Sequence, residues 1–137
     1  MANVLDTEIL LLKTLFSFGE NMNNKVYNKD FGNIAEKITQ NYLKEQGYKI
    51  VNTNYKNKIG EIDIIAKDND VIVFVEIKYR KNTNFGLPRE AVNLEKQRKI
   101  RMVATSYLNK YNLHNNQCRF DVVEILGDEI TLIKDCF

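Results

Sequence analysis

Apolar and polar residues recur with two different periods along this chain of 137 residues. Apolar residues three and four positions apart predict helices, because that spacing gathers them on one helix face. Dense runs of β-branched and aromatic residues predict strands. The expected helices cover residues 5–18, 30–46 and 89–110. The expected strands cover residues 48–55, 60–66, 71–79, 119–126 and 129–134.

Polar and glycine residues at the ends of these segments predict their boundaries. Asp30 is the expected N-cap of the second helix, and Gly47 the expected C′ residue after it. Residues 67–70 supply turn chemistry between two strands. Residues 82–88, with the only proline, are expected to form a loop before the third helix.

The predicted order α, α, β, β, β, α, β, β favours the α/β class, with a mixed sheet flanked by helices. The third helix is expected to cross over between the third and fourth strands. Residues 1–24 are expected to be an N-terminal extension with helical character, and residues 25–137 the main domain. No run approaches the roughly 20 apolar residues that span a bilayer. Without a recognisable signal peptide, we expect a cytoplasmic protein with no membrane partner.

Three charged residues interrupt the most apolar strands. Asp63 lies within residues 60–65, and Glu76 and Lys78 end the apolar run 71–78. An ionised side chain at a buried position costs several kcal/mol unless it is paired or bound to a metal. A buried ion pair between Asp63 and Lys78 is one solution. The second carboxylate favours a metal site.

The register of the hairpin decides which carboxylates meet. A two-residue loop at 69–70 puts Asp63 opposite Glu76, with Cβ atoms about 4.5–5.5 Å apart. A loop at 68–69 puts Glu61 opposite Glu76 instead. Both registers leave two carboxylates close together, and a divalent cation would relieve their repulsion.

The residue types also predict the metal and its chemistry. Oxygen ligands favour Mg²⁺ or Mn²⁺, and the only histidine, His114, stands in a polar loop. Such a metal stabilises charge on a phosphoryl oxygen and lowers the pKa of an attacking water. Lys78 lies two residues after Glu76 and therefore points to the same side of its strand. Its ammonium would orient the water and neutralise charge in the transition state.

Positive charge gathers next to this hairpin. Residues 78–110 contain nine lysines and arginines against two glutamates, a net charge of +7. Clustered cations favour a polyanion such as nucleic acid. A solvated helix face is the alternative for the charge alone, and the neighbouring acidic residues favour the nucleic-acid interpretation.

Asp63 followed by Glu76-Ile77-Lys78 resembles the D…(D/E)-X-K signature of the restriction-endonuclease-like superfamily. Further stretches resemble the YraN family of endonuclease-like proteins, which is similar to archaeal Holliday-junction resolvases. The matching stretches are 60–66, 74–80, 85–92, 96–97 and 119–123. The resemblance covers roughly residues 29–137, and residues 1–21 have no counterpart in the family pattern.

The resemblance implies a metal-dependent endonuclease that acts on DNA, including branched or flapped structures. The metal would be held by Asp63, Glu76 and the carbonyl of Ile77, with Lys78 catalytic. Resolvase-like relatives act as dimers, so a homodimer is expected by analogy. The alternatives are a nucleic-acid-binding module with a nuclease fold and no catalysis, and an interaction protein whose basic helix docks on an acidic partner.

Further site residues are implied by the resemblance. Glu36, on the helix before the sheet, would support the metal directly or through water. Gln97 corresponds to a glutamine near such sites, and Lys96 would contact phosphate, although exposed helix side chains are an equal alternative for both. Arg80 and Lys81 are expected to contact backbone phosphate or solvent.

Two other side chains have a structural and a functional interpretation. Asp121 interrupts an apolar strand; its functional interpretation is an approach to the acidic site, but we expect it to pair with Arg119 or to cap a backbone group instead. Tyr79 has an aromatic ring that would stack on unpaired bases, although core packing is commoner for such a ring.

Overall fold

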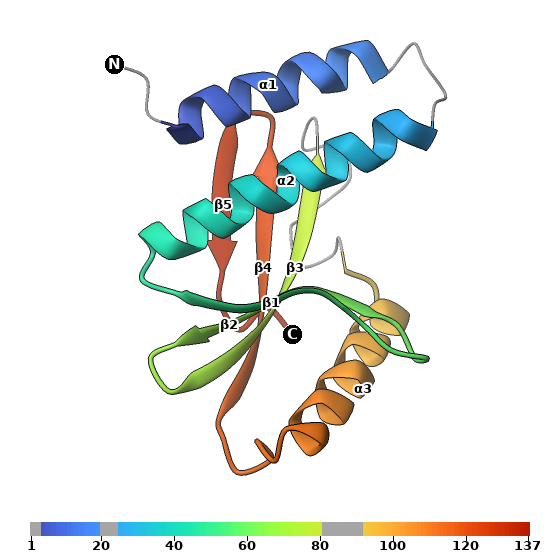
Figure 1. Cartoon of the computed structure of the whole chain (residues 1–137), viewed down its shortest axis with the longest axis vertical. Coiled ribbons are helices and arrows are strands. Elements are labelled where there is room, and N and C mark those ends of the chain that lie inside the picture. The colour runs from blue at the N-terminus through green and yellow to red at the C-terminus, as the bar shows by residue number, and fades with distance from the viewer. Residues whose placement is uncertain (1–3, 20–24, 81–91) are drawn as a thin grey trace.

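The computed structural model describes residues 4–19, 25–80 and 92–137. These residues form three helices and a five-stranded sheet (Figure 1). The helices are α1 (Val4–Gly19), α2 (Lys25–Glu45) and α3 (Leu94–Lys110). The strands are β1 (Lys49–Lys56), β2 (Glu61–Asp68), β3 (Val71–Arg80), β4 (Cys118–Leu126) and β5 (Glu129–Ile133). The predicted loop at 82–88 and Lys81 lie outside the described residues.

The strands lie in the order β1-β2-β3-β4-β5. The β1/β2, β2/β3 and β4/β5 pairs are antiparallel, and β3/β4 is parallel. The parallel pair requires a crossover, and α3 provides it as expected. The predicted α/β class with a mixed sheet flanked by helices is therefore confirmed, and the open sheet is consistent with a restriction-endonuclease-like fold.

The two faces of the sheet carry separate cores, because alternate strand residues point to opposite faces. The paired residues Ile65 and Phe74 belong to the core that contains α3. The next pair, Ile64 and Val75, belongs to the core that contains Leu43 of α2. Figure 1 accordingly shows α1 and α2 together at one end of the molecule and α3 at the other.

Helix α2 ends as the sequence predicts and begins earlier than it predicts. Gly47 has a φ of +91°, its N–H donates to the carbonyl of Lys44, and the N–H of Tyr48 donates to the carbonyl of Leu43. These two bonds form a Schellman cap. The N-cap prediction for Asp30 is wrong, since α2 already begins at Lys25.

Helix α3 begins at Leu94 rather than at residue 89. Asn93 is its N-cap, and its side-chain oxygen accepts a hydrogen bond of 2.9 Å from the N–H of Lys96. Val92, just before the cap, is buried in the core beneath the helix. Because this cap fixes the residue at which α3 begins, it also fixes the position of Lys96 relative to the site described below.

Helix α1 is the helix expected over residues 5–18, and it packs along α2 (Figure 1). Leu12 is fully buried in a cluster with Ile38 and Ile125. Lys13 pairs with Asp128 in the β4–β5 turn at 3.0 Å. No helix in the described ranges combines the length and the apolar character that a membrane crossing requires.

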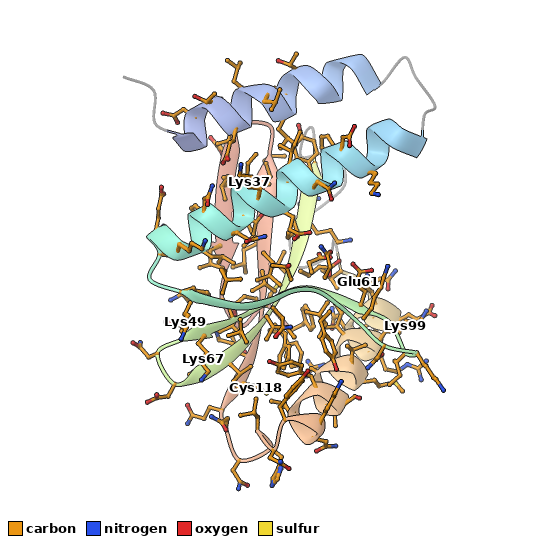
Figure 2. The ribbon with its side chains drawn as sticks, in the orientation of Figure 1. Lys37, Lys49, Glu61, Lys67, Lys99 and Cys118 are labelled. Atoms are coloured by element: carbon orange, nitrogen blue, oxygen red, sulfur yellow. The ribbon has the colours of Figure 1, made fainter. Side chains whose placement is uncertain are left out.

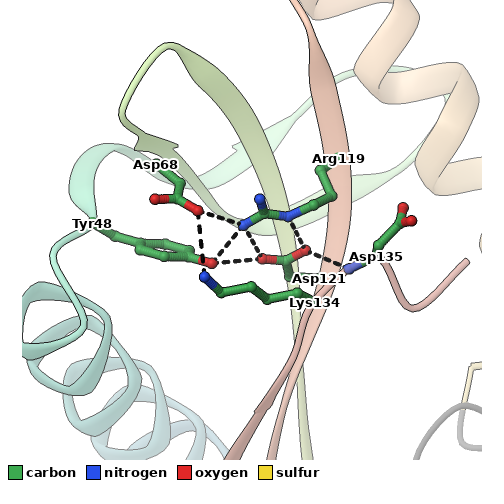
Figure 3. A network of polar contacts seen from close by, with 6 residues as sticks. All are labelled: Tyr48, Asp68, Arg119, Asp121, Lys134 and Asp135. Atoms are coloured by element: carbon green, nitrogen blue, oxygen red, sulfur yellow. Dashed lines mark hydrogen bonds and ion pairs between the residues drawn. The ribbon is translucent and has the colours of Figure 1, made fainter.

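A polar network ties the start of β1 to β4 (Figure 3). Arg119 donates to Asp121 through Nε at 2.8 Å, and the N–H of Asp135 donates to the same carboxylate at 2.9 Å. Both structural roles predicted for Asp121 are thus confirmed. The hydroxyl of Tyr48 donates to Asp121 at 2.9 Å and accepts from Arg119 at 2.6 Å. This network supplies hydrogen-bond partners for the fully buried carboxylate of Asp121. It lies near the N-terminal end of β4.

Candidate active site

The β2–β3 hairpin adopts the first of the two predicted registers. Its pairing runs from Asp68 opposite Val71 to Ile64 opposite Val75. Asp63 and Glu76 are the next residues in this register, just beyond the last paired positions. In this register Glu61 lies two residues beyond the position opposite Glu76, so the alternative that pairs them is wrong. Glu61 instead forms an ion pair of 3.3 Å with Lys56 of β1.

Strand β2 is irregular around Asp63. Regular alternation would put Ile62 and Ile65 on opposite faces, yet both belong to the α3 core. On the neighbouring strand, Asn54 falls between the residues paired with Ile62 and Ile64, and it has a left-handed φ of +50°. Distortions of this kind redirect a side chain. Asp63 accordingly points toward both β3 and the α2 side.

The opening between β2 and β3 brings the predicted carboxylates together. The N–H of Ile77 donates to Oδ2 of Asp63 at 2.9 Å, and the carboxyl group of Glu76 is hydrogen-bonded to Asp63. In an antiparallel strand, the N–H and C=O of one residue point to the same side. The carbonyl of Ile77 therefore faces the opening that Asp63 occupies.

Burial makes this carboxylate pair electrostatically costly. Burial first, and then the charge of Asp63, raise the pKa of Glu76 to about 7. Burial also raises the pKa of Asp63, while its hydrogen bond from Ile77 acts in the opposite direction. A divalent cation that accepts an oxygen from each carboxylate would remove this cost.

Two lysines approach the pair from different elements. Nζ of Lys78 lies 3.7 Å from Oε1 of Glu76, and Nζ of Lys96, on α3, lies at the same distance from the same oxygen. Glu76 is only 6% exposed, whereas the side chains of Lys78 and Lys96 are 31% and 43% exposed. Both ammonium groups are therefore accessible from solvent while they remain beside Glu76.

Glu36 lies on α2, on the other side of Asp63. Its Oε2 accepts a hydrogen bond of 2.5 Å from Nδ2 of Asn54, and its Oε1 accepts one of 3.3 Å from Gln40. Glu36, Asn54, Asp63 and Ile77 line one cavity of about 390 Å³. Sequence reasoning missed Asn54. An asparagine inside a strand was the available signal, because it is among the few residues that tolerate a left-handed backbone.

The donor set fits the predicted metal in kind. Carboxylate and carbonyl oxygens are the ligands that Mg²⁺ and Mn²⁺ prefer, and Asp63, Glu76 and Ile77 offer them in one place. In the described parts of the chain, no three Asp, Glu, His or Cys side chains converge on a metal-sized site. Glu36 is thus a neighbour of the pair rather than a member of it.

The structure separates the other predicted contact residues. Arg80 is 9% exposed, and its guanidinium donates to Glu124 at 2.6 and 3.1 Å. This burial speaks against the predicted phosphate contact for Arg80. Gln97 donates to the carbonyl of Val92 at 2.8 Å, so it braces the chain before α3.

A comparison with known proteins identifies the family. The model of the Uncharacterised protein family UPF0102 matches residues 35–125, from α2 to β4. The chain belongs to this family. The match contains every described candidate residue, from Glu36 to Gln97, and it confirms the resemblance to the YraN family, which UPF0102 comprises.

Curated UPF0102 proteins are similar over most of the chain. A UPF0102 protein of Clostridioides difficile is 52% identical over 112 residues, which cover 80% of this chain and 98% of the relative. One from Clostridium beijerinckii is 46% identical over 119 residues, covering 82% of this chain and 97% of the relative. A third, from Caldanaerobacter subterraneus, is 50% identical over 112 residues, covering 80% of this chain and 92% of the relative. These UPF0102 relatives show the family and carry no activity in their names.

Proposed function

We propose that this UPF0102 protein is a metal-dependent nuclease that hydrolyses phosphodiester bonds in DNA. The observation that carries the proposal is the pairing of Asp63 and Glu76 at the open end of the β2–β3 ladder. A buried and a half-buried carboxylate with two lysines beside them have a clear use in phosphoryl chemistry and a high cost as a purely structural feature. Branched or flapped DNA is the proposed substrate form.

Each residue has a role that follows from its position. Asp63, Glu76 and the carbonyl of Ile77 would hold Mg²⁺ or Mn²⁺, which supplies charge stabilisation and a more acidic bound water. Lys78 orients the attacking water and offsets negative charge on the phosphoryl group. Lys96 holds the substrate phosphate from the α3 side.

The test is cleavage of labelled duplex, single-stranded, flap and four-way DNA in Mg²⁺ or Mn²⁺. We expect cleavage by the wild-type protein and a loss of at least about 100-fold in Asp63→Asn and Lys78→Ala, since each removes a group that acts on the transition state. Lys67→Ala is the matched control, because Lys67 is exposed on the same hairpin at the end away from Glu61 (Figure 2).

Two results would contradict the proposal. Wild-type protein that cleaves none of the substrates would refute it. Cleavage that survives both Asp63→Asn and Lys78→Ala would place the activity elsewhere or in a contaminant.

A non-catalytic nucleic-acid-binding module is the second candidate. It is favoured by the position of Glu36, whose carboxylate is bonded to Asn54 and Gln40 instead of joining the acidic pair. DNA binding in Ca²⁺ together with failure of every cleavage assay would support this candidate. Its affinity should fall steeply with salt concentration, because phosphate contacts release counterions.

A further inference from the structure

A cavity of about 390 Å³ lies between α2 and the sheet, directly beside the carboxylate pair. Asp63 is part of its wall, so whatever fills the cavity touches the proposed reaction centre. Figure 1 shows α2 passing across the strands on this side of the sheet. The lining consists of Lys29, Phe31, Gly32, Asn33, Ala35, Glu36, Asn54, Asp63, Ile77 and Tyr79.

The size of the cavity limits what part of a DNA substrate can enter. Ligand sites for single small molecules begin at about 300 Å³. A double helix is wider than its own major groove of about 12 Å, so an intact duplex would have to stay outside the cavity. A single nucleotide that has left its base pair is the largest part of DNA that suits this space.

The walls offer the contacts that a nucleotide needs. Phe31 of α2 and Tyr79 of β3 meet edge to face, with ring centroids 4.9 Å apart, and form an apolar wall. Asn33 and Asn54 carry amide groups that both donate and accept hydrogen bonds, as base edges require. Lys29 is exposed at the rim and can pair with a phosphate.

We propose that this cavity binds one unpaired nucleotide next to the scissile phosphate, which directs the protein to single-stranded, frayed or flapped DNA. The inference rests on the proposed nuclease function and adds to it the pocket that would select unpaired DNA. An unpaired base enters such a pocket without the cost of unstacking, whereas a paired base must first be extruded. The cavity therefore selects against intact duplex.

Gly32 allows the cavity to be closed without removing any of these side chains. A Cβ atom built on Gly32 meets nothing within 4 Å, and the residue lies inside α2 with an ordinary helical backbone. Gly32→Leu therefore adds bulk to the cavity and also improves helix propensity. Gly32→Ala adds one methyl group and should have an intermediate effect. Gln46→Leu is the matched control, since it introduces the same side chain at an exposed position directly after the C-terminal end of α2.

Binding is measured by fluorescence anisotropy in Ca²⁺, with a blunt 20-base-pair duplex and the same duplex carrying a single-stranded flap. We expect the wild-type protein and Gln46→Leu to bind the flapped DNA about 10-fold more tightly than the blunt duplex, as one well-stacked base would provide. In Gly32→Leu this ratio should fall to near one, while its melting temperature stays equal or rises. A 2-aminopurine base at the junction should change its fluorescence on binding to the wild-type protein and not to Gly32→Leu.

Equal affinity of the wild-type protein for the two DNAs would overturn the inference, and so would a flap preference that Gly32→Leu retains. Absence of DNA binding would overturn it as well. Failure of the nuclease proposal and failure of the pocket proposal give different results. A Gly32-dependent flap preference in a protein that cleaves nothing keeps the pocket and refutes the nuclease. Cleavage without flap preference refutes the pocket and keeps the nuclease.

Discussion

Replacement of Glu76 by glutamine is expected to stabilise the metal-free protein above pH 7. Burial and the charge of Asp63 raise the pKa of Glu76 from an ordinary value of 4.5 to about 7. In the unfolded chain the carboxyl group loses its proton near pH 4.5, whereas in the folded protein it keeps the proton until about pH 7. Stability therefore falls as pH rises between these two values, and the full penalty is present above pH 7.

The size of the penalty follows from the same shift. At about 1.4 kcal/mol per pH unit, a rise from 4.5 to about 7 corresponds to a cost of about 3 kcal/mol. Glutamine removes the charge and keeps the shape, and the attraction of Glu76 to Lys78 and Lys96 is already included in this shift. We therefore expect Glu76→Gln to gain about 1–3 kcal/mol at pH 8.5. For a chain of this length that is a rise of roughly 3–10 °C in melting temperature.

The assay is urea unfolding followed by circular dichroism in EDTA, at pH 4.5 and pH 8.5. Glu124→Gln is the matched control, because Glu124 is equally buried on the neighbouring strand and paired with the buried Arg80. Loss of that carboxylate is expected to destabilise the protein by about 3 kcal/mol or more at both pH values. The changes in unfolding free energy caused by Glu76→Gln and by Glu124→Gln should thus have opposite signs at pH 8.5.

Divalent cations supply the complementary measurement. Bound only by the folded protein, Mg²⁺ or Mn²⁺ should raise the melting temperature of the wild-type protein at pH 8.5 and leave that of Glu76→Gln nearly unchanged. The reasoning would be refuted by a Glu76→Gln protein no more stable than wild type at pH 8.5. A gain of equal size at pH 4.5 would refute it too, because at that pH the carboxyl is protonated in the folded protein and about half protonated in the unfolded chain, so most of the penalty is absent.

Three further substitutions test other parts of the structure. Asn54→Gly permits the left-handed backbone but removes the hydrogen bond to Glu36. Mn²⁺-dependent cleavage should therefore fall about 10- to 100-fold with an unchanged circular dichroism spectrum. An unaltered rate would show that Glu36 does not contribute to cleavage. Tyr48→Phe removes a hydrogen bond to the buried Asp121 and should cost about 1–3 kcal/mol of unfolding free energy in urea titration; a neutral result would show that the carboxylate is satisfied without it. Asn93→Ala removes the cap of α3 and should cost about 1 kcal/mol, measured in the same way; no loss would mean that the helix start is held by packing alone.

Local chemistry was enough to predict the order of helices and strands and the acidic hairpin. The two-residue turn at 69–70 fixes the register of the β2–β3 hairpin. Side chains alternate along β3, so Lys78 lies on the same side as Glu76. These relations involve residues close together in sequence. The crossover between β3 and β4 was predictable for a similar reason, because parallel neighbours need a long connection.

The remaining features depend on contacts between distant segments. The basic stretch around Arg80 indicates a surface cation, but its partner Glu124 lies on a strand 44 residues later in the sequence. Helix α2 already begins at Lys25, so Asp30 lies inside the helix and does not cap it. Asn54 reads as an ordinary strand residue until its backbone angle and its bond to Glu36 are known.

The end of the β2–β3 ladder gives the site a built-in reporter. The amide hydrogen of Ile77 has no carbonyl of β2 opposite it in the pairing and is held by the carboxylate of Asp63 instead. Its exchange with solvent deuterium must then follow the state of that single side chain, while amides farther down the strand follow the unfolding of the whole sheet. One backbone hydrogen, observed by NMR, therefore records when the acidic pair is protonated, freed or engaged, without a substrate and without turnover.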